Sequence, residues 1–182
     1  MTSLVDSLSQ YASYHRDRRN IATHLVGIPA IVFGIEALLA RVTIPWLAWL
    51  PLHGWALSLA TAATVAAAAF YFAIDRRYGV AMAAFLGVSL WIGTSIAALP
   101  ALGWLLGAAG LFVGGWILQL LGHAFEGRKP AFVDDLVGLL IGPLFVVAEV
   151  GFALGRGERL RAEIERRVGP TRVGRIERTA LS

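Results

Sequence analysis

The chain of 182 residues contains no cysteine and few charged residues for its length. The absence of cysteine excludes disulfides, thiolate metal ligands and cysteine nucleophiles. Charged residues make up only 15% of the chain, whereas about 25% is usual in a soluble domain. Hydrophobic residues make up 57%. This composition predicts an integral membrane protein.

Several familiar motifs are also missing. The sequence has no P-loop, no dinucleotide fingerprint and no Gly-x-Ser-x-Gly nucleophile elbow. The first twenty residues lack a short apolar core followed by small residues, so we expect no removable signal peptide. The net charge of +4 comes from arginines that, in a membrane protein, set topology and contact anionic lipids. We therefore expect membrane lipids as partners, and no nucleic acid.

Apolar residues gather into five segments, each close to the ~20 residues that cross a bilayer as a helix. None alternates polar and apolar residues as the strands of a membrane barrel do. The expected fold is all-α, a polytopic transmembrane helical bundle with four to five membrane segments. Small residues recur along the fourth segment and predict close helix packing there, at Gly103, Gly107, Gly110 and Gly114. The five segments are Ile21–Ala40, Gly54–Ile74, Val80–Ala98, Ala101–Leu121 and Leu136–Leu154.

Arginines cluster before the first segment, between the second and third, and after the fourth. This pattern predicts a cytoplasmic N-terminus, in a membrane such as a bacterial inner membrane. Five full crossings would place the arginines after the fifth segment outside. The fifth segment also contains Pro143 and Glu149. It is therefore our first candidate for a re-entrant or in-plane segment, since broken helices at membrane depth need protein or water around them. The third segment is the weaker alternative.

The end of the chain is predicted to form a basic amphipathic helix. Leu160, Ile164 and Val168 are spaced four residues apart among arginines and glutamates. Such a helix lies on an anionic membrane surface or remains solvated. We therefore expect a transmembrane catalytic domain over residues 1–154 and a basic tail over residues 155–182.

Three of the four histidines lie where an apolar segment meets charged residues. His15 and His24 flank the start of the first segment, and His123 follows the fourth. The predicted topology places all three near the cytoplasmic boundary and His53 on the opposite face. Nine residues turn a helix through about 900°, which would point His15 and His24 to opposite sides. If both bind one metal, the helix must break between them, around residues 17–20.

Carboxylates accompany these histidines near the same boundary. A donor set of histidine and carboxylate without sulfur suits iron, zinc or manganese, and two histidines with one carboxylate is the pattern of non-haem Fe(II) oxygenases. Two alternatives stay open at this point. One is another metal-dependent membrane lipid enzyme, such as a hydroxylase or hydrolase. The other is a transporter or scaffold whose histidines are structural or proton-sensing. The candidate acids are Glu126, Asp134, Asp135 and Glu149.

The histidines belong to longer motifs. One is Tyr14-His15 with Asn20-x-x-x-His24, and another is Gly115-Trp116-x-x-Gln119-x-x-Gly122-His123. Lys129-Pro130-Ala131-x-x-Asp134-Asp135 and Gly142-Pro143-x-Phe145 follow. Together these motifs, from Tyr11 to Glu149, resemble the iron-dependent 2-hydroxy fatty acid dioxygenase family of small polytopic membrane proteins.

The resemblance implies a reaction and a cofactor. Members use Fe2+ and O2 to shorten a 2-hydroxy fatty acid by its carboxyl carbon. It also implies that His15, His24 and His123 are the essential histidines, and we expect Glu126 as the fourth ligand. We further expect polar and basic side chains near the histidines to bind the substrate, namely Arg16, Asn20, Gln119, Arg128 and Lys129.

Overall fold

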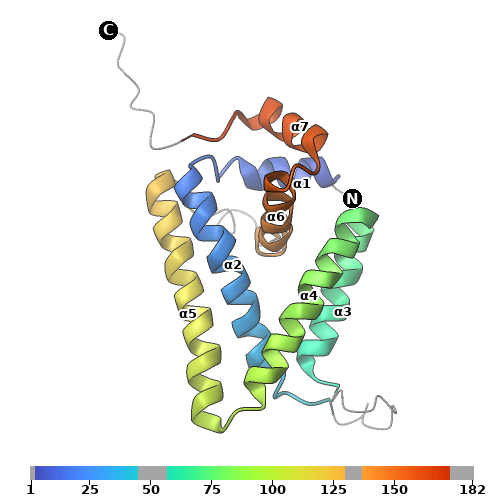
Figure 1. The fold of residues 1–182 in the computed structure, drawn as a ribbon, viewed down its shortest axis with the longest axis vertical. Coiled ribbons are helices and arrows are strands. Elements are labelled where there is room, and N and C mark those ends of the chain that lie inside the picture. Colours follow the sequence, from blue (N-terminus) through green and yellow to red (C-terminus); the bar gives the residue numbers. More distant parts are fainter. Residues whose placement is uncertain (1–2, 45–56, 130–136, 173–182) are drawn as a thin grey trace. The chain divides into compact units, whose positions relative to one another are not determined.

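The part of the chain that the computed structural model describes is all-helical (Figure 1). It comprises residues 3–44, 57–129 and 137–172. It contains seven helices and no strand, which confirms the predicted fold class. The helices are α1 (Leu4–Ala12), α2 (Arg18–Leu39), α3 (Leu59–Ile74), α4 (Arg76–Ala97), α5 (Ala101–Glu126), α6 (Gly138–Ala153) and α7 (Glu158–Val168).

Within the described residues, three helices are long and apolar enough to cross a membrane. These are α2 and α4, with 22 residues each, and α5, with 26. Helices α6 and α7 meet at a bend of 117° and together could form a fourth, broken span or a re-entrant loop. Helix α3 is shorter than its predicted segment, since it begins at Leu59, where the Ser58 side chain accepts the Thr61 N–H. Residues 54–56 of that segment lie outside the described part.

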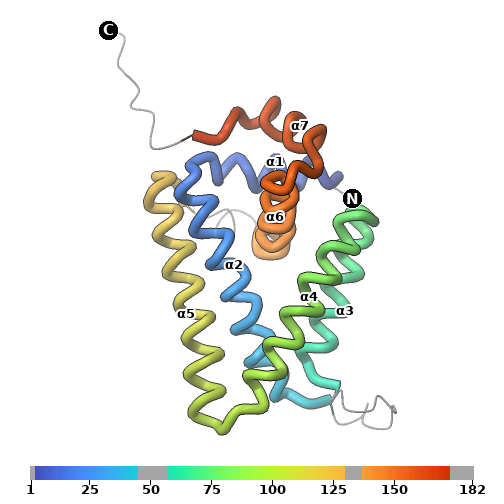
Figure 2. Tube along the Cα trace, in the orientation of Figure 1, coloured from blue at the N-terminus to red at the C-terminus, as the bar shows by residue number. Residues whose placement is uncertain are grey.

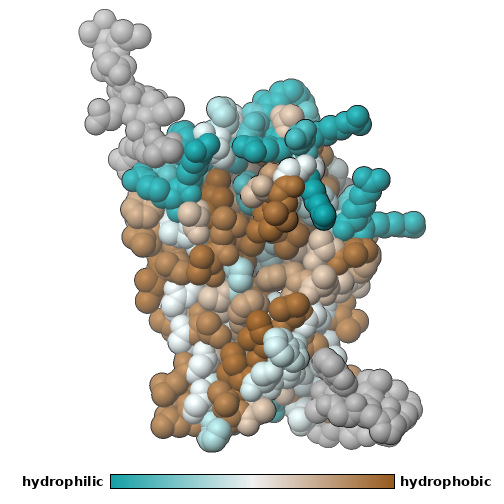
Figure 3. Space-filling model, in the orientation of Figure 1, coloured by the Kyte–Doolittle hydropathy of each residue, from teal (hydrophilic) through white to brown (hydrophobic). Residues whose placement is uncertain are grey.

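Apolar side chains cover the outer faces of the long helices, as a lipid environment requires. Trp91 on α4 is 63% exposed, and Leu106 and Ile117 on α5 are 65% and 60% exposed. In Figure 3 hydrophobic side chains lie over α2 and α5, and hydrophilic ones gather over α1 and α7. These faces indicate membrane association.

The contacts within the chain divide it into two units. One comprises residues 27–116, and the other comprises residues 2–26 together with residues 117–182. The boundary that we expected at residue 154 does not coincide with this division, and the separate tail domain stays a prediction.

In the unit of residues 27–116, α2 and α5 approach closely through glycine. A Cβ added to Gly34 would lie 2.8 Å from the Ala108 carbonyl oxygen, and one added to Gly115 would lie 2.6 Å from Ile31. By contrast, Gly110 and Gly114 face open space. The close helix packing that we predicted for the recurring glycines is therefore wrong for Gly110 and Gly114. The tight helix contact falls on a neighbouring face of α5.

The second unit contains α1, the start of α2, the end of α5, and helices α6 and α7. Helix α1 contacts both α6 and α7, and α7 runs beside α1 in the tube of Figure 2. Arg167 forms an ion pair with Asp6 at 2.7 Å. Ile164 is only 4% exposed. The apolar side of the tail helix is therefore packed against the protein.

Candidate metal centre

A turn interrupts the helices between His15 and His24. Helix α1 ends at Ala12 and α2 begins at Arg18. At the start of α2 the Asp17 carboxylate accepts the backbone N–H of Arg19 at 2.9 Å, which satisfies one of the free donors of the first turn. The break lies where the spacing of the histidines required it. It lets the His15 ring turn back toward α2.

The structure brings His15, His24 and His123 together. Each contributes a ligand atom to a group whose members lie within 4.8 Å of one another. All three side chains are buried, with exposures of 0%, 1% and 6% in that order. Ring centroids are 4.5 Å apart for His15 and His24, 4.9 Å for His15 and His123, and 5.0 Å for His24 and His123.

Hydrogen bonds to the main chain assign the protons on two of these rings. His15 Nδ1 lies 2.7 Å from the Tyr11 carbonyl oxygen, and His24 Nδ1 lies 2.9 Å from that of Asn20. A carbonyl oxygen only accepts, so each Nδ1 carries a hydrogen and donates it. In the neutral rings both Nε2 atoms then present lone pairs, and these two atoms are 3.0 Å apart. Two facing lone pairs repel unless a cation lies beside both.

The charge state of His15 also favours metal binding. Burial, and then the neighbouring His24, hold the pKa of His15 well below its usual value. The ring is therefore neutral at physiological pH, which is the form that binds metals.

The ring of His123 also has a nitrogen atom without a partner in the group of three histidines. His123 Nδ1 is buried and has no hydrogen-bond partner among the described residues. Buried polar atoms without partners are uncommon in folded proteins and call for an explanation such as a bound ion. Three neutral imidazoles without sulfur suit iron or zinc. The donor set therefore fits the iron that the family resemblance implies.

Glu126 holds the turn that carries His15. Its Oε2 accepts the backbone N–H of Arg16 at 2.9 Å and that of Asp17 at 2.7 Å. Asn20 Nδ2 donates to the same oxygen at 3.2 Å, and Arg172 pairs with Oε1 at 3.3 Å. The group of possible ligand atoms in the described residues contains only the three histidines. A ligand role for Glu126 stays a prediction, and its contacts favour a positioning role.

The predicted substrate-binding residues fall into buried and exposed sets. Asn20 and Gln119 are buried, and both Asn20 Oδ1 and Gln119 Nε2 have no hydrogen-bond partner among the described residues. Arg16 is buried too, and its guanidinium donates to three main-chain carbonyls, those of Ala12, His15 and Gly169. The exposed ones are Arg128, which donates to the Ser13 carbonyl oxygen, and Lys129. Three further candidates, His53, Asp134 and Asp135, lie outside the described residues.

Two features of the centre were not predicted. The Tyr11 ring stacks on His15 at 4.2 Å with an angle of 8° between the planes, and Phe145 packs against both rings. Only the spacing of four residues between Tyr11 and His15 hinted at this contact. The second feature is Gly122, where an added Cβ would collide with the side chains of Thr23 and Asn20 and lie 3.1 Å from His24 Nδ1. In the sequence, the indication of this close contact was the glycine directly before His123.

Fold and site together define a helical membrane-type protein with a buried three-histidine centre. Among known proteins, the Mpo1-like family, described as 2-hydroxy-palmitic acid dioxygenase Mpo1-like, matches residues 1–70 and 62–154, and the chain belongs to this family. A curated relative is 2-hydroxy-palmitic acid dioxygenase MPO1 of Saccharomyces cerevisiae, 30% identical over 167 residues that cover 91% of this chain and 89% of the relative. No solved structure matches the chain.

Proposed function

We propose that this protein is an Fe(II)-dependent dioxygenase that converts 2-hydroxy fatty acids into fatty acids one carbon shorter. Membership of the Mpo1-like family supports the substrate class. The observation that supports a bound metal is the pair of Nε2 atoms of His15 and His24, which lie 3.0 Å apart beside the unpartnered Nδ1 of His123. The main-chain hydrogen bonds of the two Nδ1 atoms leave both Nε2 atoms free to be ligands.

The reaction balances with O2 as the only oxidant. A 2-hydroxy acid R–CH(OH)–COOH and O2 give R–COOH, CO2 and water. The bond between C1 and C2 breaks, C2 becomes the new carboxyl carbon, and O2 takes up the electrons. When bound, iron supplies the one-electron chemistry that O2 requires and open positions for a 2-hydroxy acid.

The protein's own residues hold and shield the centre. The carbonyls of Tyr11 and Asn20 orient the rings of His15 and His24 by their hydrogen bonds, as outer-shell partners do in metal sites. The rings of Tyr11 and Phe145 cover His15 and exclude water. Gln119 stands one helical turn before His123, and its free Nε2 donor is our candidate to bind the substrate carboxylate.

Metal analysis and product analysis test the proposal together. Purified protein is expected to contain iron and, with 2-hydroxyhexadecanoic acid and O2, to form pentadecanoic acid. His24→Ala is expected to lose both the metal and the product, because it removes one of the converging nitrogens. His53→Ala is the matched control and is expected to keep both.

Other outcomes would contradict the proposal. Protein without a transition metal would exclude the enzyme reaction and favour a transporter or scaffold. Protein with zinc and no O2 consumption would favour a hydrolase.

A further inference from the structure

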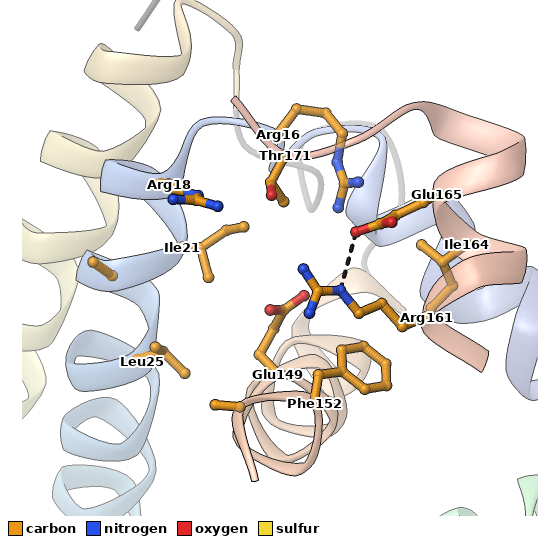
Figure 4. A pocket seen from close by; sticks show the side chains of 12 residues that line it. Arg16, Arg18, Ile21, Leu25, Glu149, Phe152, Arg161, Ile164, Glu165 and Thr171 are labelled. Atoms are coloured by element: carbon orange, nitrogen blue, oxygen red, sulfur yellow. Dashed lines mark hydrogen bonds and ion pairs between the residues drawn. The ribbon is translucent and has the colours of Figure 1, made fainter. Parts of the chain in front are cut away.

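A cavity of about 320 Å³ lies in the same unit as the histidine centre. Figure 4 shows the side chains that line it. Its walls come from the start of α2, from α6 and from α7. It adjoins the centre through Arg16, which lines the cavity and follows His15 in the chain. None of the three histidines lines it. The cavity is therefore a separate space next to the centre.

One end of the cavity has an excess of positive charge. It is lined by three arginines and two glutamates, which leaves one positive charge over (3 − 2 = 1). The charged residues are Arg16, Arg18, Arg161, Glu149 and Glu165. Arg161 forms an ion pair with Glu165 at 3.0 Å. Arg18 is exposed and has no ion pair among the described residues. One bound carboxylate would bring the net charge of these five residues and the ligand to zero.

Glu149 offers the cavity a free acceptor. Its carboxylate points toward the Arg161 guanidinium in Figure 4. No residue in the described part donates a hydrogen bond to it. It can therefore accept a hydrogen bond from a hydroxyl group of a ligand, in addition to the attraction of Arg161.

Apart from the polar side chain of Thr171, the rest of the lining is apolar. Ile21 and Leu25 on α2 face Phe152 on α6 (Figure 4), and Ala22 and Ala153 also belong to the lining. A polar end and an apolar floor in one cavity suit an amphiphile with an anionic head.

We propose that this cavity is a waiting site for the head of a long-chain 2-hydroxy acid, which the acid occupies before it reaches the histidine centre. Its carboxylate pairs with Arg18 and Arg161, its 2-hydroxyl donates to Glu149, and the first carbons of its chain lie on the apolar floor. The identity of the acid rests on the proposed function. Recognition by the cavity does not, because it needs no metal.

Binding to metal-free protein tests this directly. Native mass spectrometry counts bound molecules of three probes: 2-hydroxyhexadecanoic acid, hexadecanoic acid without the hydroxyl, and hexadecane-1,2-diol without the carboxylate. We expect the hydroxy acid to bind roughly tenfold more tightly than either of the others, since each lacks one charge-assisted contact.

Variants assign the contacts. Arg161→Gln is expected to weaken binding of both acids roughly tenfold and to leave the diol unchanged. Glu149→Gln is expected to remove the preference for the hydroxy acid over the plain acid. Arg159→Gln, an exposed charge change on the same helix that does not line the cavity, is the control and is expected to bind as the parent does. Metal uptake by each variant verifies that its histidine centre has folded.

Three results would overturn the proposal: binding of the hydroxy acid only when metal is present, unchanged binding in both cavity variants, or equal displacement of the acid by an anionic phospholipid. Failure of the proposed function looks different. If the protein binds the hydroxy acid without metal but forms no shortened product, the cavity proposal holds and the proposed reaction is wrong.

Discussion

At the scale of single residues, Glu126 determines how the turn between α1 and α2 is held. Glu126→Gln keeps the shape of the side chain but replaces one accepting oxygen by a donor, which opposes the N–H groups of Arg16 and Asp17. We expect metal affinity to fall roughly 10- to 100-fold, as for other outer-shell partners. Competition with a chelator measures this affinity.

The same measurement separates the two roles of Glu126. Glu158→Gln, an exposed carboxylate at the start of α7, is the control and should leave the affinity unchanged. Unaltered affinity in Glu126→Gln would refute the positioning role. A loss of metal as complete as in His24→Ala would instead identify Glu126 as a ligand.

Gly122 is the residue where α2 and α5 cross beside the histidines. Gly122→Ala places a methyl group against Thr23 and Asn20. We expect a destabilisation of about 1–3 kcal/mol, because a packed contact must open. Thermal unfolding and metal content measure the effect. Gly110→Ala is the matched control on the same helix, because its added methyl group meets nothing. Equal behaviour of the two variants would contradict the tight crossing.

Among the helices, α7 packs on α1, forms the ion pair of Arg167 with Asp6 and contains one buried residue, Ile164. Ile164→Asp puts a charge at a buried position of α7 and is expected to release this helix from the rest of its unit. Trypsin should then cut at the α7 arginines much faster than in the parent protein. Arg159→Asp changes an exposed position of the same helix and should not alter the cleavage rate at the other arginines. Resistance of Ile164→Asp to trypsin would show that α7 is held in another way.

Much of the arrangement of elements could be predicted from the sequence. The apolar runs predicted the long helices, and the nine-residue spacing of His15 and His24 predicted the break between them. The pairing of Asp17 with Arg172 and the packing of α7 on α1 could not be predicted, because they join residues far apart in the chain. For the same reason the hydrogen-bond donors that the Glu126 oxygens meet could not be predicted.

At the scale of the whole molecule, the absence of cysteine makes topology measurable. Single-cysteine variants at Gln10, Arg77, Leu99 and Arg128 carry the only thiol in the chain. The positive-inside pattern predicts that only Leu99→Cys reacts with an impermeant maleimide added outside intact cells. The other three should react only after the membrane is opened. Labelling of Gln10→Cys from outside would reverse the predicted orientation.

We propose that His15, His24 and His123 together hold one iron ion. Anomalous X-ray scattering from crystals of the purified protein, recorded above and below the iron absorption edge, tests it most directly. We predict a single anomalous peak among the three imidazoles that disappears below the iron edge. A centre without such a peak, or with a peak that appears only at the zinc edge, would exclude an iron site.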